Sequence, residues 1–253
     1  MVLPGLVPEL RPALPRLAVA LDAPALEPLE PVLDALHGLP ILIKVGLSLF
    51  TAVGPSIVHH MRLAGFDVFL DLKLHDIPHQ VGLAVEAIAR LDVTLVTVHA
   101  GGGRAMLEAA VHAARGRTRV VGVTVLTSLD REDLAAEGWA GALGDLVERR
   151  LVVCERAGLD GAVLAAVELP RAARLRPSFL RVVPGIRGGE AHAGGDDQAR
   201  VATAAHALAA GAGLLVVGRP VTRSPDPRAA VSALLEEIAR APQATSIKPE
   251  TMP

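Results

Sequence analysis

Eight short apolar runs recur along the chain, and the segments between them have the spacing of amphipathic helices. Runs of six to nine residues rich in Val, Ile and Leu predict strands, and their alternation with helical patterns indicates βαβ units and a parallel sheet. Eight such units in about 225 residues predict an α/β fold, a closed (β/α)8 TIM barrel that forms a single domain. The predicted strands span residues 17–23, 41–46, 66–74, 94–100, 119–126, 161–166, 179–186 and 214–220.

A doubly wound open sheet is the structural alternative to a barrel. Such a sheet usually has a Gly-rich turn after its first strand, whereas the first predicted strand here runs into LDAPALEP, with no GxGxxG motif. We therefore predict a barrel over residues 17–240, an N-terminal extension at 1–16 and a C-terminal tail at 241–253. The Pro and polar residues of the tail favour flexibility.

Composition argues against several classes of partner. The formal net charge is −2, aromatic residues make up 2% and Tyr is absent, so a nucleic-acid-binding surface is not expected. Residues 201–218 carry no formal charge, which reaches the length of a membrane span, but Gly211 and Gly213 divide them into a helix and a short strand. The apolar N-terminus is interrupted by four prolines and lacks a basic start, unlike a signal peptide. We expect a cytoplasmic protein with no membrane partner.

The stretch FLDLKLHDIP places three charged residues, Asp71, Lys73 and Asp76, within an otherwise apolar run. Side chains alternate along a strand, so Asp71 and Lys73 are predicted to share the face that points into the barrel mouth. The same alternation directs Asp22 and Lys44 into the mouth from the first two strands. Four charges are therefore expected to converge from three adjacent strands, where the catalytic groups of such barrels lie.

A structural salt-bridge cluster is the alternative interpretation of these charges, because buried charges persist only when they are paired or functional. Lysine is scarce, however: only 3 of the 25 basic residues are Lys. Arg binds carboxylates in a bidentate manner and would serve a structural pair well, but it does not give up its proton. Lys73 between two carboxylates therefore suits a general acid.

Motifs at the strand ends resemble those of bacterial orotidine 5′-monophosphate decarboxylases. The resemblance extends from about residue 17 to 240, and its motifs are highly specific when taken together and in this order. They are LDAP at 21–24, IKVG at 43–46, FLDLKLHDIP at 69–78, VHAGGG at 98–103, VTVLTS at 123–128, PGIR at 184–187, DDQ at 196–198 and GRPVTRSPDP at 218–227.

The resemblance implies a homodimeric barrel that converts orotidine 5′-monophosphate to uridine 5′-monophosphate, the last step of de novo pyrimidine synthesis, with no metal or organic cofactor. Asp71 would lie beside the substrate carboxylate, and Lys73 would stabilise the carbanion at pyrimidine carbon 6 and protonate it. Lys44 and Asp76 would complete the charge network, with Asp76 reaching into the partner subunit's site.

The same resemblance implies a set of substrate-binding residues around this network. Asp22 would bind the ribose hydroxyls, and Ser128 the pyrimidine edge, with Thr127 beside it. Arg187 would start a mobile loop over residues 187–197, for which a plain surface loop is the alternative. Gln198, Arg219 and the Gly218 backbone would hold the phosphate, and the implied set also includes Ile77, Pro78, Gln80 and Pro184.

One departure and two rival functions remain open. His79 and Gln80 stand where the family usually has Asn-Thr, so the role of Gln80 is in doubt. A magnesium-dependent sugar-phosphate lyase of the same superfamily shares Asp-x-Lys-x-x-Asp but has a Glu in place of Lys44, and a cation there would repel magnesium. A silent nucleotide-binding barrel would have no reason to keep four charges together.

Overall fold

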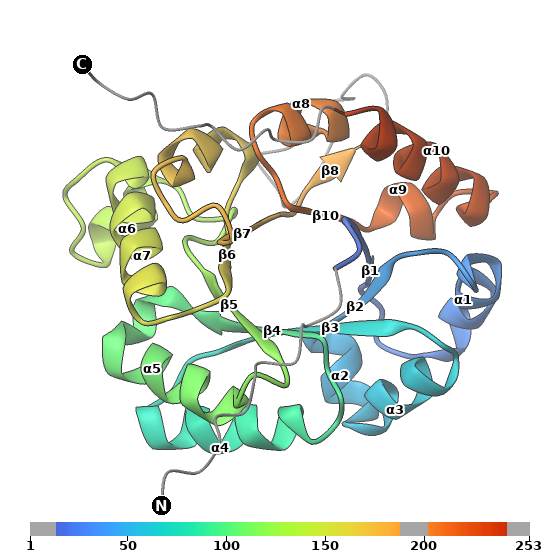
Figure 1. The fold of residues 1–253 in the computed structure, drawn as a ribbon, viewed down its shortest axis with the longest axis horizontal. Helices are drawn as coiled ribbons and strands as arrows, with labels where there is room; N and C mark the ends of the chain where they lie inside the picture. Colours follow the sequence, from blue (N-terminus) through green and yellow to red (C-terminus); the bar gives the residue numbers. More distant parts are fainter. Residues whose placement is uncertain (1–13, 188–201, 242–253) are drawn as a thin grey trace, which may run out of the picture.

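Eight parallel strands close into a barrel in the computed structural model, which describes residues 14–187 and 202–241 (Figure 1). The predicted (β/α)8 fold is confirmed. Around the barrel the strands follow the order β1, β10, β7, β6, β5, β4, β3, β2 and back to β1. Their bounds are β1 Leu17–Leu21, β2 Leu42–Gly46, β3 Asp67–Leu74, β4 Leu95–His99, β5 Arg119–Val123, β6 Gly161–Val163, β7 Leu180–Val183 and β10 Leu214–Val217.

Helices surround the ring of strands (Figure 1). The segment 201–218, whose lack of charge raised the question of a membrane span, contains the short helix α8 and strand β10. No helix within 14–187 and 202–241 has the length and apolarity needed to cross a membrane. The helices are α1 Glu30–Leu36, α2 Leu47–Val53, α3 Ser56–Leu63, α4 Pro78–Ala89, α5 Gly103–Ala114, α6 Arg131–Ala136, α7 Leu143–Arg156, α8 Ala204–Ala209, α9 Arg219–Thr222 and α10 Pro227–Arg240, with 3-10 helices at Glu27–Leu29, Ala100–Gly102 and Ala166–Ala172.

Alternation along the strands separates the apolar side chains into two cores. One core lies between strands and helices and includes Ile43, Val45 and Leu70. The other fills the barrel interior, because the intervening residues of each strand point inward. It consists of Ala18, Ala20, Leu42, Phe69, Leu95, Val121, Val182, Leu214 and Val216. The inner core fills the barrel below the mouth, and the mouth is formed by the carboxyl ends of the strands.

Several strands end earlier than the sequence predicted. The run at 119–126 is a strand only to Val123, although Val125 beyond it is still buried. Near the end of the run at 179–186, Ile186 and Arg187 form β8 (Ile186–Arg187), which pairs with β9 (Ala202–Thr203) in a separate two-stranded parallel sheet. Apolar residues thus continue past the strand ends into the wall of the barrel mouth.

Close contact between β6 and β7 generates a test of the fold. A Cβ atom at Gly161 would collide with the backbone carbonyl of Leu180, which cannot move without disturbing the strand pair. We expect Gly161→Ala to lower the free energy of unfolding by about 1–3 kcal/mol, the range typical of overpacked cores. Urea titration followed by circular dichroism measures this change.

Gly82→Ala is the matched control, because Gly82 lies within α4 and a Cβ there would meet only ordinary contact, 3.9 Å from the Ala109 carbonyl oxygen. Alanine is the better helix former, so this variant should be unchanged or more stable by about 0.5–1 kcal/mol. Equal effects of the two substitutions would contradict the described packing of β6 on β7.

Candidate active site

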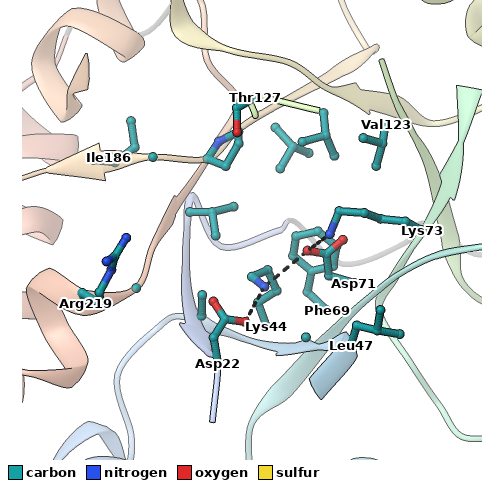
Figure 2. Close-up of a pocket in the computed structure, with 18 of the residues that line it drawn as sticks. Asp22, Lys44, Leu47, Phe69, Asp71, Lys73, Val123, Thr127, Ile186 and Arg219 are labelled. Carbon is teal, nitrogen blue, oxygen red and sulfur yellow. Dashed lines mark hydrogen bonds and ion pairs between the residues drawn. The ribbon is translucent and has the colours of Figure 1, made fainter. Parts of the chain in front are cut away.

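A cavity of about 1020 Å³ opens at the carboxyl ends of the strands (Figure 2). This volume is at the upper end of the range for small-molecule sites. Most of the predicted site residues line it, and they come from loops and strand ends far apart in the sequence. Those residues are Asp22, Lys44, Asp71, Lys73, Thr127, Pro184, Arg187, Gly218 and Arg219.

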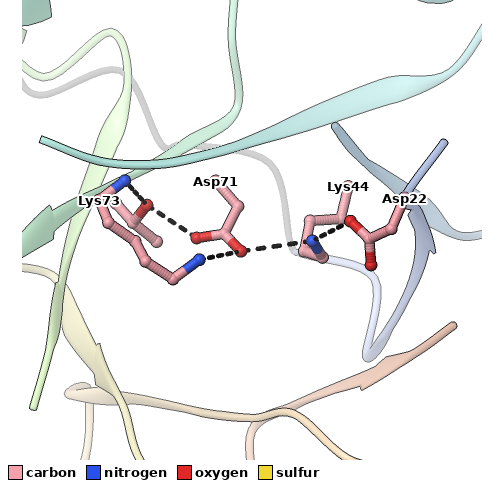
Figure 3. Close-up of polar contacts among 5 residues, drawn as sticks. Asp22, Lys44, Asp71 and Lys73 are labelled. Atoms are coloured by element: carbon pink, nitrogen blue, oxygen red, sulfur yellow. Dashed lines mark hydrogen bonds and ion pairs between the residues drawn. The ribbon is translucent and has the colours of Figure 1, made fainter. Parts of the chain in front are cut away.

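Four of these side chains form a continuous row of alternating charge (Figure 3). Lys44 Nζ lies 3.2 Å from Asp22 Oδ1 and 3.3 Å from Asp71 Oδ2. Lys73 Nζ donates to the same Asp71 oxygen at 2.9 Å. The side chain of Lys44 is 10% exposed and that of Asp71 is 14%, whereas that of Lys73 is 38% exposed. Lys73 is therefore the ammonium group of the row that faces the cavity most openly.

Opposite charges keep the buried members of this row ionised. Burial alone would lower the pKa of Lys44, but attraction to Asp71 and Asp22 outweighs it and the pKa lies above its ordinary value. Burial alone would raise the pKa of Asp71, but the charges of Lys44 and Lys73, with hydrogen bonds from Lys73 and Thr97, hold it below its usual range. At neutral pH Lys44 is therefore positively charged and Asp71 negatively charged.

The backbone places Lys73 in the mouth in a way that simple alternation does not describe. Pairing of β3 with β4 shifts register between Leu70 and Leu74, and Lys73 has a left-handed backbone with φ 51°. This conformation costs a non-glycine residue about 1–2 kcal/mol. Lys73 lines the cavity as predicted, but it reaches the cavity through this register shift and left-handed backbone.

Thr97 of β4 is a functional candidate that the sequence reasoning missed. Its hydroxyl donates to Asp71 Oδ1 at 2.9 Å and accepts from the Lys73 backbone N–H at 2.8 Å. Alternation along β4 provides the missing signal, because Leu95 points into the inner core and Thr97 lies two residues further along the strand.

The opposite side of the cavity carries arginines. Figure 2 shows Arg219 across the cavity from Lys73 and Asp71. Arg187 and Arg223 also line the cavity, and Arg223 was not predicted although it lies one helical turn after Arg219. Apolar side chains, among them Val123 and Val163, also line the cavity. The cavity thus suits an elongated ligand with an anionic end.

Some predicted site residues lie elsewhere in the structure. The predicted site residues just before and at the start of α4 are exposed, and so is Ser128. None of these residues lines the cavity of the described chain. Gln198 and the predicted mobile loop from residue 188 onward fall outside the described residues. The exposed set consists of Asp76, Ile77, Pro78, Gln80 and Ser128.

His99, at the end of β4, is a hydrogen-bonded histidine rather than a member of the charged row. Its Nδ1 accepts from the Gly101 backbone N–H at 3.2 Å, and its ring stacks on His75 with centroids 5.0 Å apart. Burial, together with the charges of Arg150, His75 and Lys73, lowers the pKa of His99 to about 4. Its imidazole is therefore neutral at physiological pH.

This environment of His99 predicts a pH dependence of stability. A histidine whose pKa is lower in the folded state binds fewer protons when folded than when unfolded. Above the unfolded pKa of about 6.5 the histidine is neutral in both states, so its protonation does not affect the free energy of unfolding there. As the pH falls from there toward 4, the folded state is progressively destabilised. We expect urea midpoints of His99→Asn to fall less between pH 7.5 and pH 4.5 than those of the wild type.

His59→Asn, which changes an exposed histidine of α3, is the matched control for that series. Parallel pH curves for the wild type and His99→Asn would show that His99 is not held in its neutral form.

Comparison with known proteins now identifies the family. Residues 15–234 match the family model described as "Orotidine 5'-phosphate decarboxylase / HUMPS family". A protein of Halorhodospira halophila named orotidine 5'-phosphate decarboxylase is 48% identical over 234 residues, covering 91% of this chain and 98% of the relative. One of the same name from Nitrosomonas europaea is 46% identical over 231 residues, covering 89% and 97%.

Solved structures give the same result. The crystal structure of orotidine 5'-phosphate decarboxylase from Lactobacillus acidophilus is 32% identical, with a TM-score of 0.78, covering 87% of this chain and 97% of that one. That of an uncharacterized conserved protein from Geobacillus kaustophilus is 36% identical, with a TM-score of 0.76, covering 87% and 99%. The chain therefore belongs to the orotidine 5′-phosphate decarboxylase / HUMPS family.

Proposed function

We propose that this decarboxylase converts orotidine 5′-monophosphate to uridine 5′-monophosphate, the last step of de novo pyrimidine synthesis, without a metal ion. The observation that carries the proposal is the row Asp22–Lys44–Asp71–Lys73 at one side of a cavity whose other side bears arginines. The names of the relatives support the substrate, and the charged row supports the chemistry.

The reaction breaks one carbon–carbon bond and forms one carbon–hydrogen bond. The bond from pyrimidine carbon 6 to the carboxylate breaks, carbon dioxide leaves, and the electron pair stays on carbon 6. Lys73 ends the row, and its ammonium is the more exposed of the two, so it can stabilise this carbanion and then transfer a proton from Nζ to carbon 6. Asp71 holds the ammonium at 2.9 Å. It would lie beside the leaving carboxylate. Solvent returns the proton to Lys73.

The remote parts of the substrate are assigned to the rest of the cavity. Arg219 and the Gly218 backbone would bind the phosphate together with Gln198, since a guanidinium and backbone N–H groups suit a dianion. The loops after the seventh and eighth barrel strands are the usual phosphate site of this fold. Asp22 would bind the ribose hydroxyls. Binding energy from the phosphate, far from carbon 6, can then be used to order the reacting groups.

The position of Lys44 supports the metal-free reaction over a magnesium-dependent relative. Its Nζ lies between the carboxylates of Asp22 and Asp71, within 3.3 Å of an oxygen of each. A divalent cation would need those same oxygens and would be repelled by the ammonium group.

Exposure at the start of α4 supports a homodimer in which Asp76 enters the partner's site. Asp76 is exposed and lies outside the cavity of its own chain, and the adjacent Ile77 is 63% exposed. An apolar side chain beside a carboxylate suits a subunit contact better than free solvent. Gln80 follows on the same turn of helix, so its contact with substrate would also depend on the dimer. A cytoplasmic location is supported by the lone cysteine, Cys154, which is buried and free.

The proton-donor role of Lys73 is tested by two substitutions. Lys73→Ala removes the ammonium, and Lys73→Arg keeps a positive charge that does not give up its proton. We expect both to lower kcat by at least about 10²–10⁴-fold, the usual range for loss of a general acid. Loss of substrate absorbance measures turnover, and EDTA should leave the wild-type rate unchanged.

Arg104→Ala, which removes an exposed cation paired with Glu108, is the matched control and should retain wild-type turnover. Inhibition of the wild type by EDTA would favour a magnesium-dependent reaction. Full activity of Lys73→Arg would show that Lys73 acts by charge alone.

The shared site is tested by mixing two inactive variants, Lys73→Ala and Asp76→Asn. In a mixed dimer one site contains both substitutions and the other contains neither. Random exchange of equal amounts makes half of the dimers mixed, so about a quarter of the wild-type activity should return. Unmixed variants are the controls. No recovery after exchange has been verified by native mass spectrometry would place Asp76 in the site of its own subunit.

A further inference from the structure

We propose that Thr97 is a positioning residue that fixes the proton donor Lys73 and the carboxylate of Asp71 relative to each other. The inference rests on the proposed function, because the two groups that Thr97 joins are those assigned to the reaction. Neither the charged row nor the sequence motifs indicate a role for Thr97.

The hydroxyl of Thr97 connects the side chain of Asp71 to the backbone of Lys73 through two different hydrogen bonds. It donates to Asp71 Oδ1 at 2.9 Å, while the other oxygen, Oδ2, accepts from Lys73 at 2.9 Å and from Lys44 at 3.3 Å. Both oxygens of the carboxylate are thereby held, which fixes the plane of the group. Without the Thr97 contact, the carboxylate could rotate about its last bond and carry the ammonium group with it.

The second bond acts on the backbone of the proton donor. Lys73 N–H donates to Thr97 Oγ1 at 2.8 Å, at the point where β3 and β4 shift register. A hydroxyl can donate one hydrogen bond and accept two, so a single Thr satisfies both partners. The left-handed backbone of Lys73, with φ 51°, is thus held by the same atom that orients Asp71.

Complete burial gives this arrangement its rigidity. Thr97 is 0% exposed, so water does not compete for its hydroxyl in the structure as described. A buried carboxylate that loses a donor is poorly compensated, and a catalytic group displaced by about 1 Å can lose about 10²-fold in rate. Thr97 bonds to Asp71 and Lys73, the residues assigned to the chemical step, so its effect is expected on that step.

Three variants separate positioning from packing. Thr97→Val keeps the shape and removes the hydroxyl, and Thr97→Ser keeps the hydroxyl. Thr118→Val makes the same change at another buried threonine, whose hydroxyl donates to the Val93 carbonyl at 2.8 Å before the start of β5, at the opposite end of the barrel. Thr97→Ala is a second variant without the hydroxyl, for use if Thr97→Val does not fold.

Crystal structures of the Thr97 variants and steady-state kinetics are the two measurements. We expect kcat of Thr97→Val to fall about 10- to 100-fold with KM changed less than about threefold, and Thr97→Ser and Thr118→Val to stay within about threefold of the wild type. The acid limb of kcat/KM should move to higher pH in Thr97→Val, because the hydroxyl helps to lower the pKa of Asp71. In its crystal structure Asp71 should be rotated and the Lys73 backbone changed.

Unchanged positions of Asp71 and Lys73 in the Thr97→Val structure would overturn the proposal, and so would a kcat equal to that of the wild type. The crystal structures decide the positioning role even if the wild type fails to decarboxylate orotidine 5′-monophosphate, a result that would refute the proposed function separately.

Discussion

The active site depends on the pairing of the Asp71 carboxylate with two lysine ammonium groups. One of its oxygens lies within 3.3 Å of two ammonium groups, those of Lys44 and Lys73, which would repel each other without a negative charge between them. Burial of such a row is unfavourable unless every charge has a partner. Asp22 pairs with Lys44 at one end of the row, so of the two ammonium groups Lys73 is the more exposed and the one that can reach a ligand.

The barrel accommodates this row of charges because its interior is divided into two regions. Below the mouth, apolar side chains such as Ala20, Leu42 and Phe69 fill the space between the strands. At the mouth, strands β2 and β3 and the end of β1 bring the charged residues together, whereas Arg187 comes from β8 and Arg219 from the start of α9. The groups assigned to the reaction therefore lie on or next to barrel strands, and the groups assigned to the remote anion lie on the elements that follow the later strands.

The fold and the inward direction of the charged row could be predicted from sequence because both follow from periodicity, whereas the roles of the substrate-binding residues came from the family resemblance. Eight repeats of one unit predict the barrel, and alternation along the strands directs Asp22, Lys44 and Asp71 inward. The conformation of Lys73 could not be predicted, since its register shift is a property of the β3–β4 pair rather than of either strand. The exposure of Asp76 does not follow from periodicity either, and its proposed role in a second subunit came from the family resemblance.

The central claim is that Asp71 and Lys73 act as one unit, and a double-mutant cycle in kcat tests it most directly. Asp71→Asn, Lys73→Ala and the double variant would be compared with the wild type by release of labelled carbon dioxide. Because Asp71 acts chiefly by holding Lys73, the double variant should be no more than about tenfold slower than the slower single variant. Losses that multiply across the two substitutions would show that the carboxylate and the ammonium act independently, and would contradict the account.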